Sequence, residues 1–105
     1  MIRHCVFIRF KPTISVAYKT ELFNEIDALK DRLPGMVAVH IGTNVSPETG
    51  MDKGFSDGFI VDFADGSARD AYLADPGHRE TGARLVAAAE GGIAGIFVYD
   101  LETDD

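Results

Sequence analysis

Positive charge, cysteine and long hydrophobic runs are all scarce in this chain of 105 residues. It has 10 Lys and Arg against 17 Asp and Glu, and its formal net charge is -7. We therefore expect no nucleic-acid partner and no binding to anionic membranes, because both need concentrated basic residues. The single cysteine, Cys5, excludes an intrachain disulfide and a cysteine-based zinc cluster. No run approaches the roughly 18 apolar residues of a membrane span, and no signal-peptide pattern precedes the first strand-like residues. A cytoplasmic location is the expectation.

The overall amino-acid composition is that of an ordinary globular domain. Hydrophobic residues make up 46% of the chain and charged residues 26%, which argues against both disorder and a fibrous repeat. The length suits one domain, residues 1–105, with a single modest core. We find no internal repeat or low-complexity segment.

The residue patterns predict the order strand, helix, strand, strand, helix pair, strand. Alternating apolar residues predict strands at 2–10, 36–42, 56–63 and 93–101. Apolar residues at three- and four-residue spacing predict a helix over 15–33. Ser67 is the expected N-cap of a short helix that runs to Leu73, and Asp75 with Pro76 is expected to begin another helix. Residues 42–57 are rich in turn residues and form a candidate lid or interface loop.

This order predicts an α+β, ferredoxin-like (split βαβ) domain: a four-stranded antiparallel sheet with its helices on one face. The other face of the sheet is then uncovered, and Cys5, Phe7 and Ile60 lie on it. One chain has no spare helix to bury these residues. A homodimer joined through the sheet face solves this problem, because each sheet covers the other.

Three residues are the main candidates for chemistry. His78 falls in the first turn of the last helix and, by helical spacing, points towards the core. It is a candidate general base, a candidate ligand contact, or simply a core histidine bonded to a backbone carbonyl. Tyr72 is either an oxyanion donor or an ordinary core aromatic. His4 shares a strand face with Val6 and Ile8, so it either lines the same space or is a satisfied core histidine.

Other residues are expected to complete a site between the sheet and the helices. Asp57 begins the third predicted strand and could orient His4 or His78, although a solvated aspartate is the more common outcome. No close metal-ligand spacing occurs, so we expect no metal. The apolar lining suits an apolar or aromatic ligand with a few polar anchors, and the expected ligand-binding residues are His4, Val6, Ile8, Phe23, Ile26, Asp57 and Phe59.

Several short motifs, taken in order, resemble the stress-responsive α/β barrel (Dabb) domain family of the dimeric α/β barrel superfamily. They cover nearly the whole chain. These motifs are Ile2-Arg3-His4, Phe10-Lys11-Pro12, Leu33-Pro34-Gly35, Gly42-x-Asn44-x-Ser46-Pro47, Lys53-Gly54-Phe55 and Ala71-Tyr72-Leu73-x-x-Pro76-x-His78. The resemblance implies a homodimer whose two sheets close into a barrel with the helices outside.

One branch of that family contains plant polyketide cyclases, which close a linear polyketide by an aldol reaction without a metal or redox cofactor. Tyr72 and His78 match the tyrosine and histidine that bind substrate and abstract a proton there, and His4 matches a further pocket histidine. The sequence departs from the cyclase pattern at Asp57, where the cyclase has another histidine. The segment from Gly91 to Gly95 also looks longer before the last strand.

These observations leave three functional hypotheses. The first is a stress-response protein that binds a small apolar or aromatic molecule. The second is a cofactor-free, cyclase-like lyase with His78 as general base and Tyr72 as oxyanion donor. The third is a purely structural dimerisation domain whose interior is filled by its own side chains. The superfamily also includes cofactor-independent oxygenation and haem degradation, for which this sequence has no distinctive residue.

Overall fold

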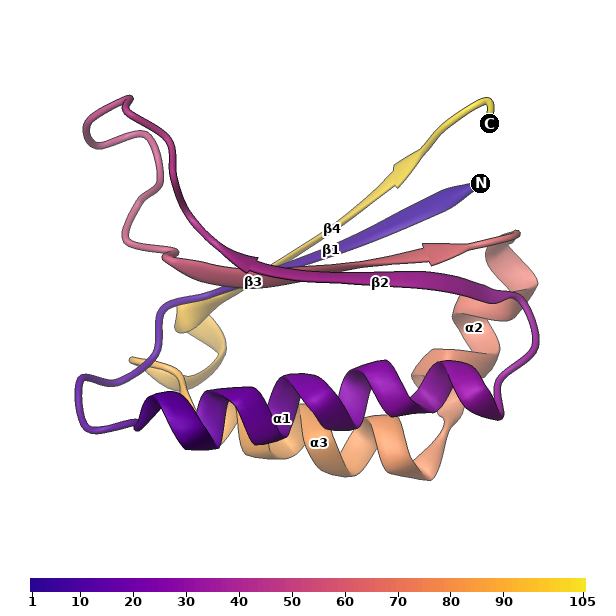
Figure 1. Ribbon diagram of the computed structural model, residues 1–105, viewed down its shortest axis with the longest axis horizontal. Coiled ribbons are helices and arrows are strands. Elements are labelled where there is room, and N and C mark those ends of the chain that lie inside the picture. The colour runs from indigo at the N-terminus through magenta and orange to yellow at the C-terminus, as the bar shows by residue number, and fades with distance from the viewer.

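The computed structural model describes residues 1–105 as one sheet covered on one face by helices (Figure 1). The strands are β1 (Ile2–Ile8), β2 (Met36–Thr43), β3 (Asp57–Phe63) and β4 (Ile96–Glu102). They are antiparallel and lie in the order β2-β3-β1-β4. The helices are α1 (Val16–Ala28), α2 (Gly66–Ala74) and α3 (Pro76–Ala88), with short 3₁₀ segments η1 (Leu29–Asp31) and η2 (Gly92–Gly95). The ferredoxin-like fold predicted from the sequence is confirmed.

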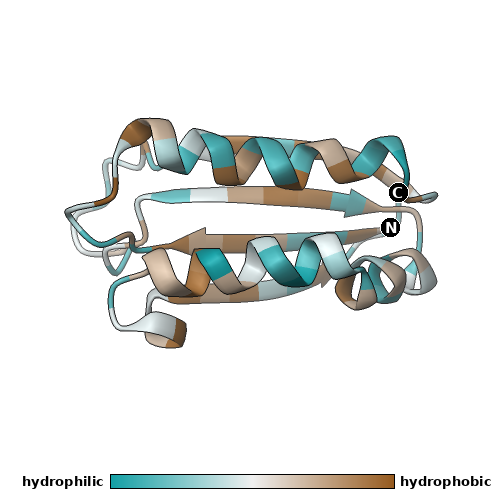
Figure 2. Ribbon diagram, turned by 90° about the horizontal axis from the view of Figure 1, so that it is seen from below, coloured by the Kyte–Doolittle hydropathy of each residue, from teal (hydrophilic) through white to brown (hydrophobic).

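The core lies between the sheet and the helices. Along β1, side chains alternate between the two faces, and Ile2, His4, Val6 and Ile8 are the buried ones. Helix α1 contributes the apolar stripe of Leu22, Phe23 and Ile26. Seen from the helix side, α1 and α3 run roughly along the direction of the strands, and hydrophobic stretches of the strands lie between and behind them (Figure 2).

Helix α1 is shorter than the prediction of 15–33. Ser15 caps its N-terminus, and its hydroxyl accepts a hydrogen bond from the Tyr18 backbone N–H at 3.1 Å. The α-helical hydrogen bonds end at Ala28, and the chain tightens into η1. Pro34 disfavours a helical conformation for the residue before it, and Gly35 with a φ of 84° turns the chain towards β2.

The N-cap of α2 is Asp65 rather than the predicted Ser67. An Asp65 carboxylate oxygen accepts from the backbone N–H of Ala68 at 2.8 Å, and the helix has already begun at Gly66. The prediction failed because two good capping residues stand two positions apart, and local sequence does not choose between them. The prediction for α3 is confirmed: Asp75 is its N-cap and Pro76 its first residue.

The first and last strands are also shorter than predicted. β1 ends at Ile8, and Phe10 makes only an isolated bridge with Ala89. β4 begins at Ile96 rather than Ile93, because η2 occupies the preceding residues. Gly95 is required there: a Cβ atom would stand 2.4 Å from the carbonyl oxygen of Glu90.

The face of the sheet away from the helices is uncovered and rich in aromatic residues. Phe97, Tyr99 and Leu101 of β4 are each about half exposed, at 48%, 53% and 48%. They lie opposite Phe7, Cys5 and Arg3 of β1. The loop 44–56 rises at one end of this face. The N-terminal end of β1 and the C-terminal end of β4 curve up at the other end (Figure 1). None of the helices combines the length and apolar character that a membrane-spanning helix needs.

Candidate functional site

Three rings from three elements meet between the sheet and the helices: His4 of β1, Tyr72 of α2 and His78 of α3. The ring centroids of Tyr72 and His78 are 4.1 Å apart, and those of His4 and Tyr72 are 5.6 Å apart. The alternation of β1 turns His4 inward, and the Asp75-Pro76 break starts α3 so that His78 falls in its first turn. The structure therefore brings together the three residues that the sequence singled out.

Two polar atoms in this cluster are buried without a hydrogen-bond partner. They are the Tyr72 hydroxyl and Nδ1 of His78. Tyr72 is fully buried, and His78 is half-buried. Most buried polar atoms in folded proteins have a partner, so each exception needs an explanation. A group that binds at this point can supply one.

The surroundings set the protonation states of these two residues. Burial raises the pKa of Tyr72, so its hydroxyl stays protonated and remains a donor at neutral pH. Burial also lowers the pKa of His78, and the positive charge of His4 in its protonated form lowers it further, against smaller opposing effects of the Leu73 backbone and Asp75. His78 is therefore neutral at pH 7 and able to accept a proton.

His4 belongs to an ion-pair chain that the sequence did not predict. Its Nδ1 lies 2.6 Å from a carboxylate oxygen of Asp100 in β4, and the other oxygen accepts from Arg69 of α2 at 2.9 Å. Burial acts to raise the pKa of Asp100, but the hydrogen bonds with His4 and Arg69 bring it below its usual value. Alternation along β4 could have placed Asp100 on the inner face, but only the β1–β4 register shows that it lies opposite His4.

Arg32 and Asp75 hold the corner between α2 and α3. The guanidinium of Arg32 donates to both carboxylate oxygens of Asp75, at 2.6 and 2.7 Å. Asp75 also accepts from the His78 backbone N–H at 3.0 Å, as the N-cap of α3. The hydrogen bonds from Arg32 lower the pKa of Asp75 to about 2. This pair fixes where α3 begins and hence where the His78 ring lies.

The remaining predicted site residues are distributed along the core. Val6, Ile8, Phe23, Ile26 and Phe59 are all buried and form its apolar wall. Asp57 stands apart: it pairs with Ile8 at the opposite end of the sheet from Tyr72, and its carboxylate lies 3.1 Å from Nζ of Lys19. Asp100 therefore takes the place beside His4 that was suggested for Asp57.

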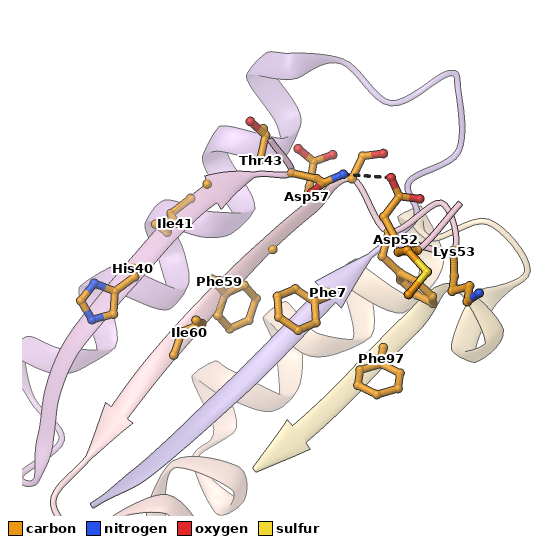
Figure 3. Close-up of a pocket in the computed structure, with 16 residues that line it drawn as sticks. Phe7, His40, Ile41, Thr43, Asp52, Lys53, Asp57, Phe59, Ile60 and Phe97 are labelled. Carbon is orange, nitrogen blue, oxygen red and sulfur yellow. Dashed lines mark hydrogen bonds between the residues drawn. The ribbon is translucent and has the colours of Figure 1, made fainter. Parts of the chain in front are cut away.

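A groove of about 600 Å³ lies on the uncovered face of the sheet, beneath the loop 44–56 (Figure 3). Its apolar lining includes Phe7, Phe55 and Phe97, and its polar lining includes His40 and Lys53. Gly58 forms part of the lining, and a Cβ there would collide with Phe7 at 2.6 Å. His4, Tyr72 and His78 do not line this groove. The groove belongs to the face that the sequence assigned to dimerisation.

No group of three or more His, Cys, Asp or Glu side chains is arranged to hold a metal ion.

Comparison with protein families now adds to this geometry. Residues 2–103 match the stress-responsive A/B barrel domain, Dabb. The chain belongs to this family. The Dabb family accounts for the ferredoxin-like fold and for the order of the short motifs that the sequence contains. No curated protein matches the chain.

Solved structures resemble this Dabb domain over almost its entire length. A dimeric ferredoxin-like protein of unknown function from Jannaschia sp. CCS1 has a TM-score of 0.90 and 31% identity, covering 97% of this chain and 98% of that one. An Arabidopsis thaliana protein has a TM-score of 0.86 and 24% identity, covering 100% and 97%. The hydroxynitrile lyase from Passiflora edulis has a TM-score of 0.82 and 21% identity, covering 99% and 94%. The last two likenesses show the fold alone.

Proposed function

We propose that this Dabb domain binds a small apolar or aromatic molecule between the sheet and the helices, with Tyr72 and His78 as its polar anchors. The observation that carries the proposal is the pair of unpartnered buried atoms on neighbouring rings. Leaving a buried polar atom without a partner costs about 1–3 kcal/mol. A ligand carbonyl oxygen placed beside the Tyr72 hydroxyl would accept from it and remove part of this penalty.

The rest of the predicted site supplies the apolar contacts. Phe23, Ile26 and Phe59 pack close together: the Phe23 and Phe59 ring centroids are 5.7 Å apart. Asp57, paired with Lys19, would meet only the far end of a long ligand. Because Tyr72 is fully buried, binding requires a rearrangement that opens a path to its hydroxyl.

Native mass spectrometry of protein purified from its own host tests this proposal. We expect the wild-type chain to retain a small-molecule adduct and Tyr72→Phe to lose it. Tyr99→Phe is the matched control, because it removes a hydroxyl from the uncovered face, and it should keep the adduct. An adduct that survives Tyr72→Phe would contradict the assigned anchor. No adduct in any of the three proteins would favour a purely structural dimerisation domain.

A second candidate function is cofactor-free lyase or cyclase chemistry at the same rings. The lowered pKa of His78 favours it, because a neutral imidazole can take a proton from the carbon beside a ligand carbonyl. The Tyr72 hydroxyl, kept protonated by its raised pKa, would donate a hydrogen bond to the enolate oxygen that forms. The Passiflora edulis lyase supports the idea only in that a similar fold carries a lyase.

Deuterium exchange into the methyl group of acetophenone, followed by NMR in D₂O, tests proton abstraction directly. We expect His78→Gln to slow the catalysed exchange by about 10²- to 10⁴-fold. The wild-type rate should rise with pH through the lowered pKa of His78, because only the neutral ring is a base. His40→Gln, on the uncovered face, is the matched control and should leave the rate unchanged. Equal rates in the two variants would overturn the catalytic role.

We also propose that the protein is a homodimer joined through its sheet face. The half-exposed aromatic residues of β4 support this, because burying the remaining half of each side chain against a second sheet would stabilise the pair by about 1 kcal/mol. The Jannaschia protein, the relative with 31% identity, is described as dimeric. An isologous pairing would cover both sheets with a single contact.

A further inference from the structure

The ion-pair chain from Arg69 through Asp100 to His4 joins α2, β4 and β1 at the edge of the ring cluster. Each oxygen of the Asp100 carboxylate has one partner: Nδ1 of His4 at 2.6 Å and Nη1 of Arg69 at 2.9 Å. Arg69 makes a separate contact with Asp70, an exposed residue whose carboxylate accepts from Nε of Arg69 at 2.9 Å. Both oxygens of Asp100 are therefore oriented, and neither is free to rotate away from His4.

This arrangement determines which nitrogen of His4 carries the proton. An ionised carboxylate only accepts hydrogen bonds, so Nδ1 of His4 must donate. Asp100 is ionised at neutral pH, because its pKa lies below the usual value. Whenever the His4 ring is neutral, its proton is therefore on Nδ1, and Nε2 is left with a lone pair. The His4 ring packs edge-on against Tyr72, with an interplanar angle of 70°, so His4 belongs to the same ring cluster as Tyr72.

We propose that Arg69 and Asp100 are positioning residues that hold His4 as the Nδ1–H tautomer, and that they thereby select ligands carrying a hydrogen-bond donor beside an acceptor. The selectivity rests on the proposed function, in which the ligand lies against Tyr72 and His78. The Tyr72 hydroxyl donates to the ligand acceptor, and Nε2 of His4 accepts from the ligand donor. A neutral amide or a hydroxy-carbonyl group meets both requirements, whereas a carboxylate can only accept.

Long-range ¹H–¹⁵N correlation spectra of the histidine rings test the positioning role without any ligand. In the wild-type protein, at a pH where the ring is neutral, we expect the His4 proton on Nδ1. In Asp100→Ala that signal should shift to a mixture of tautomers or to Nε2–H. Asp70→Ala is the matched control: it removes the other carboxylate bonded to Arg69 and should leave His4 unchanged. A wild-type Nε2–H form, or identical His4 spectra in wild type and Asp100→Ala, would overturn the proposal.

Arg69→Met provides a second variant if Asp100→Ala does not fold, since it leaves β4 intact. Losing the Arg69 hydrogen bond frees one oxygen of Asp100, so we expect partial loss of the Nδ1–H form. Arg69→Lys restores a donor and should recover it. A spectrum of Arg69→Met identical to that of the wild type would remove Arg69 from the positioning role.

The ligand preference is tested with benzamide and benzoate, which share a shape and differ in whether they carry a donor. NMR titration should show the wild-type protein favouring benzamide by about tenfold, the equivalent of one hydrogen bond. In Asp100→Ala the ratio of the two affinities should fall, because His4 can then donate from Nε2. A ratio that does not change, or no binding of either compound, would overturn the selectivity. The tautomer spectra judge the positioning role separately, whatever the outcome for ligand binding.

Discussion

The Tyr72 hydroxyl is the residue-scale feature that best separates a binding role from a structural one. A buried hydroxyl without a partner opposes folding, so Tyr72→Phe should raise the free energy of unfolding by about 1–3 kcal/mol. Urea denaturation monitored by circular dichroism measures this difference.

Thr81→Val provides the contrasting control for that measurement. Thr81 is also buried, but its hydroxyl donates to a carboxylate oxygen of Glu25 at 3.2 Å. Its removal should destabilise the protein by about 1–2 kcal/mol. If Tyr72→Phe is destabilising to the same extent as Thr81→Val, the Tyr72 hydroxyl has a partner within the protein and its assignment as a ligand anchor is wrong.

The coupling between the two histidines gives a second residue-scale prediction. Replacing His4 by Gln removes the charge that lowers the pKa of His78, so that pKa should rise. The lowering effect of burial, the largest cause, should remain in this variant. NMR titration of the His78 ring signals between pH 4 and pH 8 measures the shift. An unchanged or lower pKa would show that the rings are not coupled.

At the scale of elements, the start of α3 depends on one carboxylate with two functions. Asp75 caps the helix and pairs with Arg32, and its pKa is lowered to about 2 from 3.8. The stabilisation from its charge is fully present above pH 3.8 and is lost as the pH falls through about 2. Asp75→Ala should therefore lower the thermal midpoint at pH 7 by roughly 4–8 °C, and this difference from the wild type should shrink in acid.

Asp65→Ala is the control for the acid dependence. It removes the N-cap of α2, where Asp65 accepts a 2.8 Å hydrogen bond from Ala68 without an arginine partner. We expect Asp65→Ala to lower the thermal midpoint at pH 7 by a similar amount. Its difference from the wild type should change less between pH 4 and pH 2. Thermal melts by circular dichroism across this range make the comparison. If the difference in thermal midpoint from the wild type changes with pH to the same extent in both variants, the ion pair with Arg32 does not explain the acid dependence.

At the scale of the whole molecule, the uncovered sheet should determine the assembly. Phe97 is 48% exposed at the centre of the aromatic face and stacks on Phe7 and Tyr99. Phe97→Glu would place a charge in the proposed sheet-to-sheet contact, so we expect this variant to be a monomer at micromolar concentration and the wild type to be a dimer. Sedimentation equilibrium measures the difference.

Ile93→Glu is the matched control for the assembly. Ile93 is also an exposed apolar residue, at 79%, but it lies in η2 outside the sheet. Ile93→Glu should therefore leave the proposed dimer intact. A wild-type protein that sediments as a single chain would contradict the proposed homodimer, and dissociation by both variants would move the contact away from the sheet face.

Much of the fold follows from local patterns. Alternation and helical spacing identified every strand and helix, and Ser15, Asp75 and Pro76 are found at the helix starts where local chemistry favours them. The errors are at boundaries: Asp65 outcompetes Ser67 as a cap, and η1 and η2 replace ends that were predicted as helix and strand. These boundaries depend on how the chain turns so that its helices dock on the sheet, and the sequence of a single segment does not determine that.

The sequence by itself determined the layering of the molecule and the inward direction of His4, Tyr72 and His78, because side-chain direction follows from the periods of strands and helices. Only the tertiary structure decided that the three rings touch, that Asp100 rather than Asp57 stands beside His4, and that Arg69 and Arg32 hold this end of the molecule together. It also placed the groove on the uncovered face. The physical reason is the same in each case: strand register and helix docking bring together residues that are distant in the chain.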